Sequence, residues 1–462
     1  MLSLSILMAT FAAFVVLCVK PKWGSYIVWF VLFTYPHNWW FQRQWIPLNI
    51  GVDDLFCILL FLIVVLRRNL FGGVAVRWGY AFWVLSGFLW VASIAIISGS
   101  LDAPAFERVL YYKDVMKLFV YWGLFYAILH CIDDVQDVRR QFTWFALASV
   151  VGGGIVILHG LFPGRMSAWS NPLLLDIEGV TGRASGAFLN PNNAACIMAC
   201  SLAMIVTAIR LQRSFVSKLC IYGLCGILLV ALLVTRSRSG LLAMAGTFCL
   251  MAVVGQNKRV AWMILLGGIL LGTFFVGIRQ AVQERVATVY SSSSGTWGGN
   301  VTGRVDMWIS YVQTATPQNY LLGQGHRAGI ARNSSETHSA YVSLLTVYGL
   351  GGLAWAVFSV GTFFRKAFER EPYEDPLIMI VRCGCVWALV AWGIYAMSAD
   401  AISSQYPRYL LFYMVVLLDR ASAISCQVSQ EVLWEDEYLD AMESFEEACE
   451  PFETSQPECT SL

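Results

Sequence analysis

Arginine is the residue best suited to do chemistry in this chain, because it recurs in three short polar segments that lie between apolar runs. The segments are 182–193 (GRASGAFLNPNN), 235–240 (TRSRSG) and 303–308 (GRVDMW). A guanidinium group binds phosphate oxygens through two parallel hydrogen bonds, so clustered arginines indicate a phosphate or diphosphate ligand. The candidate ligands to such an anion are Arg183, Arg236, Arg238 and Arg304.

The segment 235–240 gives the strongest indication. Arg236 and Arg238 join two apolar runs with almost no loop, and no Asp or Glu lies nearby in the sequence to pair with them. Charged side chains at a membrane boundary are costly unless they are paired or solvated. A ligand phosphate is one partner that meets this need, and snorkelling to the lipid headgroups is the alternative.

The segment 182–193 ends where an apolar run begins. Asn192 is expected to cap the N-terminus of a helix there, and that N-terminus would add its partial positive charge and free N–H groups to Arg183. The alternative is a tight turn and cap without a ligand. Asn190, Asn192 and Trp308 are the side chains expected to contact the substrate.

A fourth segment, 337–341 (THSAY), supplies a candidate general base. His338 stands where a long polar loop meets the next apolar run. Histidine titrates near neutral pH, which suits proton transfer, although a lone histidine is often structural.

Composition defines the elements that must position these residues. Of the 462 residues 58% are hydrophobic and only 13% are charged, about half the charged share of a soluble domain. This excludes a water-soluble globule and predicts an all-α polytopic membrane protein with about 12–13 transmembrane helices. The apolar runs lie near 3–19, 23–36, 54–66, 79–98, 115–130, 142–162, 193–209, 219–234, 240–254, 260–278, 339–364, 377–397 and 406–418.

Lys and Arg in the short loops predict the orientation, because cytoplasmic loops are enriched in both. The loops that alternate with the arginine segments are expected in the cytoplasm. Two long loops, 163–192 and 279–338, are then expected in the periplasm. The cytoplasmic bases are Lys20, Lys22, Arg67, Arg68, Arg77, Arg139, Arg140, Arg210, Arg213, Lys218, Lys258, Arg259, Arg365, Lys366 and Arg370.

The formal net charge of +1 divides unevenly along the chain. Residues 431–462 contain 11 acids and neither Lys nor Arg, so the rest of the chain is net +12. We expect a transmembrane body over 1–420 and an acidic cytoplasmic tail over 421–462. The tail is expected to be disordered and to be a docking segment for a cytoplasmic partner.

The order of these motifs resembles the O-antigen ligase and polymerase family of bacterial envelope polysaccharide enzymes, over roughly residues 40–420. The matching pieces are 182–193, 235–240, GRVDMW with LLGQG over 303–325, and THSAYVSLLTVYGLGG over 337–352. The stretch from YPHNWW to DDLF is also similar to the polymerase and exosortase-linked branches. The acidic tail and a possible thirteenth span depart from the family pattern.

The resemblance implies a membrane glycosyltransferase of the GT-C type in the bacterial inner membrane. Its donor would be a polyprenyl-diphosphate-linked glycan on the periplasmic side, with no cofactor, nucleotide sugar, metal or nucleic acid. The resemblance implies three catalytic residues. Arg238 matches the family's arginine that follows a mid-chain serine, and Arg304 matches its loop arginine before an aromatic residue. His338 matches the family's essential histidine. Arg183 and Arg236 fit the same pattern.

The implied reaction leaves the acceptor open among a lipid A core, a growing glycan and a protein side chain, and so does not separate ligase from polymerase. The arginines would hold the diphosphate while His338 takes the acceptor proton. The alternative function is a transporter or flippase of lipid-linked glycans, or another multispanning permease. Such proteins place charges near mid-membrane, whereas Lys117 and Arg382 are nearly the only charges inside the apolar runs.

Overall fold

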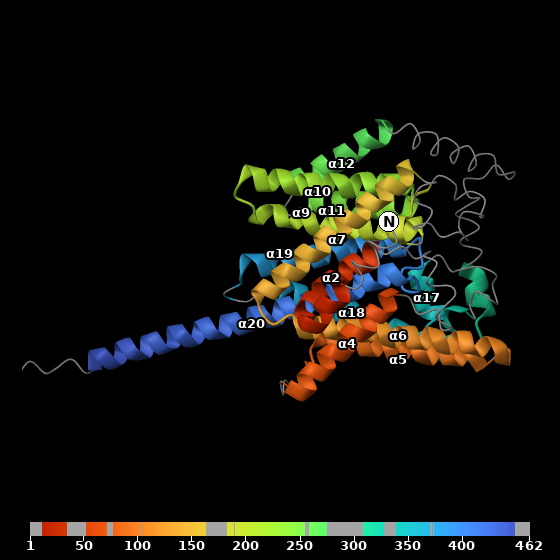
Figure 1. The fold of residues 1–462 in the computed structure, drawn as a ribbon, viewed down its shortest axis with the longest axis horizontal. Helices are drawn as coiled ribbons and strands as arrows, with labels where there is room; N and C mark the ends of the chain where they lie inside the picture. Colours follow the sequence, from red (N-terminus) through yellow and green to blue (C-terminus); the bar gives the residue numbers. More distant parts are fainter. Residues whose placement is uncertain are drawn as a thin grey trace, which may run out of the picture.

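The computed structural model describes residues 12–34, 52–71, 77–101, 103–162, 183–188, 190–254, 258–274, 308–327, 339–369, 372 and 374–448. All regular secondary structure in these segments is helical, and seven of the described helices are long and apolar enough to cross a membrane (Figure 1). The all-α polytopic fold is therefore confirmed. Twelve of the described helices have 14 or more residues, and the number of 12–13 spans stays a prediction.

The helices follow the apolar runs closely. In chain order the longer ones are α2 (Pro21–Thr34), α4 (Val52–Phe71), α5 (Tyr80–Leu101), α6 (Ala105–Cys131), α7 (Val135–Leu161), α9 (Pro191–Thr207), α10 (Phe215–Val234), α11 (Arg238–Val253), α12 (Lys258–Phe274), α18 (Gly349–Phe368), α19 (Pro376–Ala396) and α20 (Gln405–Ala448). Shorter elements are η1 (Gly186–Phe188), η2 (Ala208–Leu211), α15 (Pro317–Leu322) and α17 (Ala340–Thr346).

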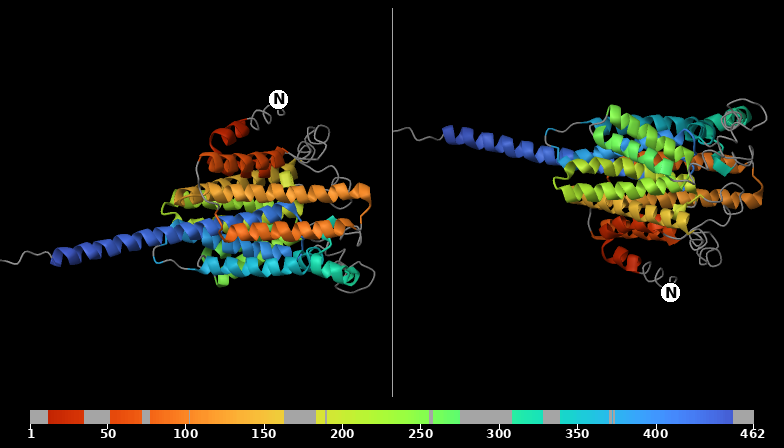
Figure 2. Two further views of the ribbon diagram at one scale, coloured as in Figure 1. Left: turned by 90° about the horizontal axis from the view of Figure 1, so that it is seen from below. Right: turned by 90° about the horizontal axis from the view of Figure 1, so that it is seen from above.

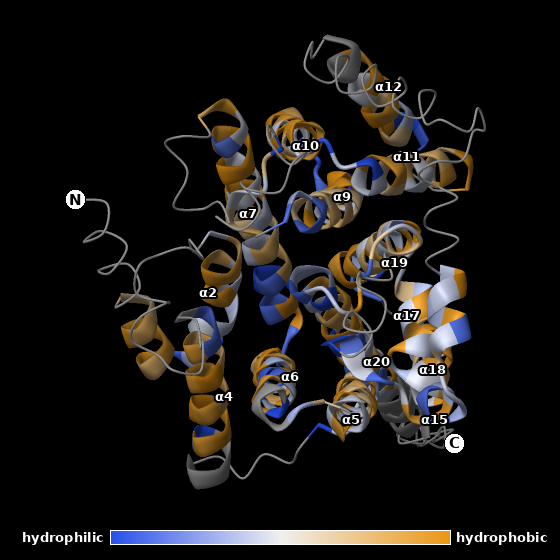
Figure 3. Cartoon of the chain, turned by 90° about the vertical axis from the view of Figure 1, so that its right-hand side faces the viewer, coloured by the Kyte–Doolittle hydropathy of each residue, from blue (hydrophilic) through white to orange (hydrophobic). Residues whose placement is uncertain are grey.

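Two helices form the centre of the bundle. Every residue is buried over 194–207 of α9 and over 406–422 of α20. Residues 194–207 contain no charged side chain, and a helix that is apolar on nearly all sides is expected to be buried. α20 packs against α5, α6, α7, α9, α18 and α19. Seen end-on, peripheral helices such as α4 and α10 are mostly hydrophobic (Figure 3), as expected for surfaces that face lipid.

The apolar run 339–364, expected to be one span, is two helices. α17 ends at Thr346 and α18 begins at Gly349, whose φ is +67°. The break frees the carbonyl oxygen of Val347, which accepts hydrogen bonds from the backbone N–H groups of Gln324 (3.1 Å) and Gly325 (3.0 Å). The chain breaks here because another loop inserts its N–H groups into the helix end.

The expectation of disorder in the acidic tail is wrong for residues 421–448, because α20 continues through them and projects well beyond the bundle (Figures 1 and 2). Ser429 is 2% exposed, whereas Trp434 is 73% exposed, so the buried part of α20 ends between these residues. Glu, Ala, Leu and Met favour helix, and an existing helix adds residues without a new nucleus. The division of the chain at residue 420 stays a prediction.

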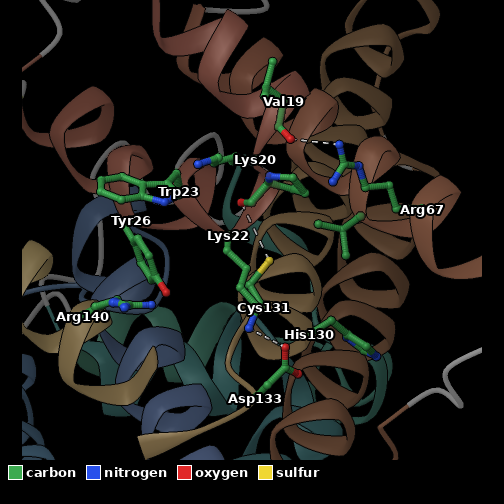
Figure 4. A pocket seen from close by; sticks show the side chains of 12 residues that line it. Val19, Lys20, Lys22, Trp23, Tyr26, Arg67, His130, Cys131, Asp133 and Arg140 are labelled. Carbon is green, nitrogen blue, oxygen red and sulfur yellow. Dashed lines mark hydrogen bonds and ion pairs between the residues drawn. The ribbon is translucent and has the colours of Figure 1, made fainter. Parts of the chain in front are cut away.

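One end of the bundle has predicted cytoplasmic bases around a pocket of about 460 Å³ (Figure 4). One of these bases, Lys22, has two carboxylate partners: its ammonium lies 2.8 Å from Asp133 and 2.6 Å from Asp137. Arg77 also pairs with Asp133, at 2.5 Å. These contacts tie the start of α2 to the turn between α6 and α7. The opposite end, which we call the motif end, contains the N-termini of α9, α11, α17 and α20.

Candidate functional site

The carboxamide oxygen of Asn192 joins two of the arginine segments. It accepts one hydrogen bond from Nη2 of Arg183 (2.8 Å) and another from Oγ of Ser237 (2.8 Å). Nε of Arg183 also donates to the carbonyl oxygen of Thr235 (3.3 Å). The segments 182–193 and 235–240 therefore meet at one place, although more than forty residues separate them in sequence. We call Arg183, Asn192, Arg236, Ser237 and Arg238 the arginine junction.

Two helices begin at this junction, each with its own cap. Asn190, rather than Asn192, caps α9: its side chain accepts from the N–H of Asn192, and Pro191 occupies the first turn. The prediction of Asn192 as the cap was wrong because proline, which has no N–H, fits the first helical position and the cap precedes it. Ser237 caps α11 by accepting from the N–H of Gly240 (3.4 Å).

The two N-termini lie against each other because Gly240 has no side chain. A Cβ atom at Gly240 would lie 2.4 Å from the Cβ of Ala195. Each helix N-terminus adds a partial positive charge and free N–H groups. Two such ends beside three arginines make this part of the motif end suited to bind an anion.

Arg236 has an unusual backbone conformation. Its φ is +51°, and among the described non-glycine residues it alone has a positive φ. It follows the last turn of α10, where glycine normally takes this conformation. The Arg236 guanidinium makes no hydrogen bond or ion pair with any described residue. Strain of this kind concentrates at functional sites, and an arginine in this conformation carries a conformational cost.

Contacts from α7 and α20 hold the segment 183–188 in place. The backbone N–H of Gly186 donates to Nδ1 of His159 (3.1 Å), and the hydroxyl of Tyr406 donates to the carbonyl oxygen of Ala187 (3.1 Å). The ring of Tyr406 also packs edge-on against Phe188. The first turn of the central helix α20 thus packs against the segment that contains Arg183 and holds it in place.

The described parts of the LLGQG and TVYGLGG motifs form a second cluster at the motif end. Gly323, with φ +81°, packs against the break between α17 and α18, where an added Cβ would lie 2.5 Å from the carbonyl oxygen of Val347. A Cβ on Gly349 would lie 2.6 Å from the nitrogen of Gly323. The LLGQG piece and the TVYGLGG piece therefore contact each other through their glycines, a pairing that the sequence alone did not predict.

The turn places His326 and Arg327 at a polar cavity of about 330 Å³. Arg327 pairs with Asp114 of α6, and the hydrogen bond to Asp114 is the main cause that raises the pKa of Arg327. Nδ1 of His326 lies 3.6 Å from the buried carboxylate of Asp400, which also accepts from Oγ of Ser343 (2.8 Å). Sequence reasoning missed Asp400 and His326. The one available signal in the sequence was the position of Asp400, a carboxylate just before the last apolar run.

Two of the predicted catalytic residues, Arg304 and His338, lie outside the described residues. The chain directly after His338 is described: Ser339 precedes α17, and the N–H of Ala340 donates to the carbonyl oxygen of Ala399 (3.1 Å). Trp308 begins a helix over 308–314 and is half-buried. The roles predicted for these residues and for Asn190 stay predictions.

Residues 223–357 match the family model described as O-Antigen ligase. This confirms the resemblance inferred from the motifs, since 235–240, 303–325 and 337–352 all lie inside the matched range. The segment 182–193, which the structure joins to 235–240, lies before it. No curated protein is similar enough to the chain to count as a match.

Proposed function

We propose, from the O-Antigen ligase match over residues 223–357, that this membrane protein transfers glycan from a polyprenyl-diphosphate-linked donor to a hydroxyl acceptor. The reaction takes place at the motif end of the bundle, which faces the periplasm of a bacterial inner membrane. It belongs to cell-envelope polysaccharide biosynthesis. Neither a metal nor a cofactor takes part.

The observation that carries the proposal is the arginine junction. A diphosphate brings negative charge and many acceptor oxygens, and it needs several forked donors close together. Arg183, Arg236 and Arg238 come from two segments that Asn192 connects through hydrogen bonds of 2.8 Å. The N-termini of α9 and α11 add further positive potential. Asn192 is a positioning residue here, because its oxygen is already occupied by Arg183 and Ser237.

The chemical step is a substitution at the anomeric carbon of the donor. The acceptor oxygen forms a bond to that carbon while the bond from the carbon to the diphosphate oxygen breaks. His338 takes the proton from the acceptor hydroxyl, and the arginines, with Arg304 from the long loop, neutralise the charge on the departing polyprenyl diphosphate. Trp308, on the helix that follows Arg304, contacts the sugar.

The contacts around α17 support the role of His338. The residues that follow it are pinned by the bond from Ala340 to Ala399 and by the bond from Ser343 to Asp400. A base must be held within hydrogen-bonding reach of the proton that it removes. Asp400, whose carboxylate is 1% exposed, therefore fixes the element that presents His338.

The test is glycan transfer with purified protein and a purified lipid-linked donor. Arg238→Ala and His338→Ala should each reduce transfer by at least about a hundredfold, the usual scale for a lost catalytic group. Arg213→Ala is the matched control, because Arg213 is an exposed arginine beyond the other end of α9, and it should keep full activity.

The acceptor is identified in cells that lack the gene. Loss of all polymer from its anchor identifies a ligase, and a single capped repeat unit identifies a polymerase. If the purified protein forms no glycosidic bond but moves the lipid-linked glycan across a vesicle membrane, it is a flippase and the proposal is wrong. Transfer that survives both Arg238→Ala and His338→Ala would contradict the assigned roles.

A further inference from the structure

The polar cavity beside His326 and Arg327 contains a buried cation that the proposed diphosphate site does not use. Arg408, in the first turn of α20, lines this cavity and is 8% exposed. Its guanidinium carbon lies 5.0 Å from the ring centre of Tyr121 and 5.8 Å from that of Phe88. The two rings hold the guanidinium in a fixed position.

The hydrogen bonds of Arg408 are incomplete. Nη1 donates to the carbonyl oxygen of Ile402 at 3.4 Å, and Nε is buried without any partner. Arg408 also makes no ion pair with a carboxylate in the described part of the chain. A buried charge that lacks a counter-ion destabilises a fold, so its retention beside a cavity points to a ligand.

The other charges at the cavity have partners. Asp114 pairs with Arg327, and Lys117 lies 3.9 Å from Asp54. Asp400 is held by Ser343 and by the backbone N–H of Ser403. Arg408 is therefore the one cavity cation, among the described residues, that has no carboxylate oxygen within 4.0 Å.

The rest of the lining is suited to hydroxyl groups. The phenol oxygen of Tyr348 lies 3.3 Å from Oγ of Ser403, and Gln405 donates to the hydroxyl of Tyr409 (2.9 Å). Aromatic rings can pack against a sugar ring, and hydroxyl and amide groups can hydrogen-bond its hydroxyls, so this lining suits a sugar. The cavity volume of about 330 Å³ is at the small end of ligand pockets, and it fits one sugar ring.

We propose that this cavity is a subsite for an acidic sugar, with Arg408 binding the carboxylate and the hydroxyl-lined wall binding the ring. One unmatched positive charge balances one carboxylate, whereas a phosphate carries about −1.5 to −2 at neutral pH. The subsite rests on the proposed function, because the acidic sugar is taken to be part of the donor or acceptor glycan. The contacts from Tyr406 to Ala187 and from Tyr409 to Tyr121 connect it to the arginine junction.

The test measures binding of two simple probes to the full-length protein in lipid nanodiscs, without donor. Methyl glucuronoside should bind at least tenfold more tightly than methyl glucoside to the wild-type protein. Arg408→Met should abolish this preference, and Arg408→Lys should retain part of it, because lysine keeps the charge but loses the fork. Arg420→Met is the matched control: Arg420 lies on the same helix, is also 8% exposed and bonds the carbonyl oxygen of Ile132. This variant should keep the full preference.

Stability gives a second readout. Arg408→Met removes an uncompensated charge, so its Tm should equal or exceed that of the wild type. If both Arg408 variants lower Tm more than Arg420→Met does, Arg408 is structural and the subsite is wrong. The subsite is also wrong if the wild type shows no preference for the glucuronoside, or if inorganic phosphate binds more tightly than the glucuronoside.

The two proposals fail separately. Glycan transfer without glucuronoside binding overturns the subsite alone. Glucuronoside binding through Arg408 without transfer overturns the glycosyltransferase alone.

Discussion

Arg236 combines a charge that suits the donor with a backbone conformation that suits glycine. Its φ of +51° follows the end of α10, where a side chain costs roughly 1–2 kcal/mol relative to glycine. On the proposal made above, the guanidinium of Arg236 binds the donor diphosphate, and this role would account for an arginine in this conformation.

We expect Arg236→Gly to raise the free energy of unfolding by up to about 1 kcal/mol while weakening donor use. The measured quantities are Tm and kcat/KM for the lipid-linked donor. Arg236→Ala is the matched variant: it loses the same charge but keeps the strain, so it should lose as much transfer without the gain in stability. A glycine variant with unchanged transfer would show that Arg236 does not hold the diphosphate.

At the scale of elements, the break between α17 and α18 holds the turn at Gly323–Gly325 that precedes His326. Gly349 has φ +67°, and a Cβ there would lie 2.6 Å from the nitrogen of Gly323 and 2.8 Å from the carbonyl oxygen of Leu321. We expect Gly349→Ala to cost at least about 2 kcal/mol and to reduce transfer, because the turn that carries His326 must move.

The matched control for this change lies on the same helix. Gly361 has open space around it, so Gly361→Ala should stabilise α18 by roughly 0.5–1 kcal/mol and leave transfer unchanged. Thermal unfolding and the transfer assay on both variants check this. Equal effects at the two glycines would mean that the break has no special role.

At the end of the bundle opposite the motif end, the ion pairs of Asp133 should make the stability of the protein fall in acid. Burial raises the pKa of Asp133, but the hydrogen bonds from Lys22 and Arg77 lower it more, so its pKa lies below the ordinary value of 3.8. A carboxylate with a depressed pKa adds stability at and above its ordinary range, and this stability is lost as the pH falls through the folded-state pKa.

We therefore expect the Tm of the wild type to fall below about pH 5, and part of this fall to disappear in Asp133→Asn. The half-exposed pair limits the effect, since solvent screens such charges. Glu435→Gln, an exposed acid far along α20, is the control and should keep the wild-type pH profile. An unchanged profile in Asp133→Asn would contradict the assigned contacts.

At the scale of the whole molecule, α20 serves both the core and the acidic extension. Residues 406–422 are buried on all sides, and Ser429 is still 2% exposed. We expect a chain that stops after Glu435 to keep its Tm and its transfer activity. A chain that stops after about residue 425 removes buried residues and should lose stability. Loss of transfer in a stable chain that ends at Glu435 would give the acidic extension a part in catalysis.

Sequence was sufficient to predict the helical membrane fold, because apolar runs of this length have one stable form in a bilayer. It also singled out the arginine segments, since a charged group at a membrane boundary needs a partner or water. That their ligand is a diphosphate stays a prediction. It did not predict that 339–364 breaks into two helices, nor that α20 runs through the acidic tail. Both outcomes depend on what packs beside the segment rather than on its own composition.

Only the tertiary structure decided which segments meet. Asn192 contacts Ser237, and Gly323 contacts Gly349, across gaps that no local pattern spans. No pattern in the sequence singles out Arg408. Its significance comes from burial beside Phe88 and Tyr121 with no described carboxylate within 4.0 Å of its guanidinium. Residue type determines which ligand a side chain can bind, whereas packing between distant helices determines whether its charge is already neutralised.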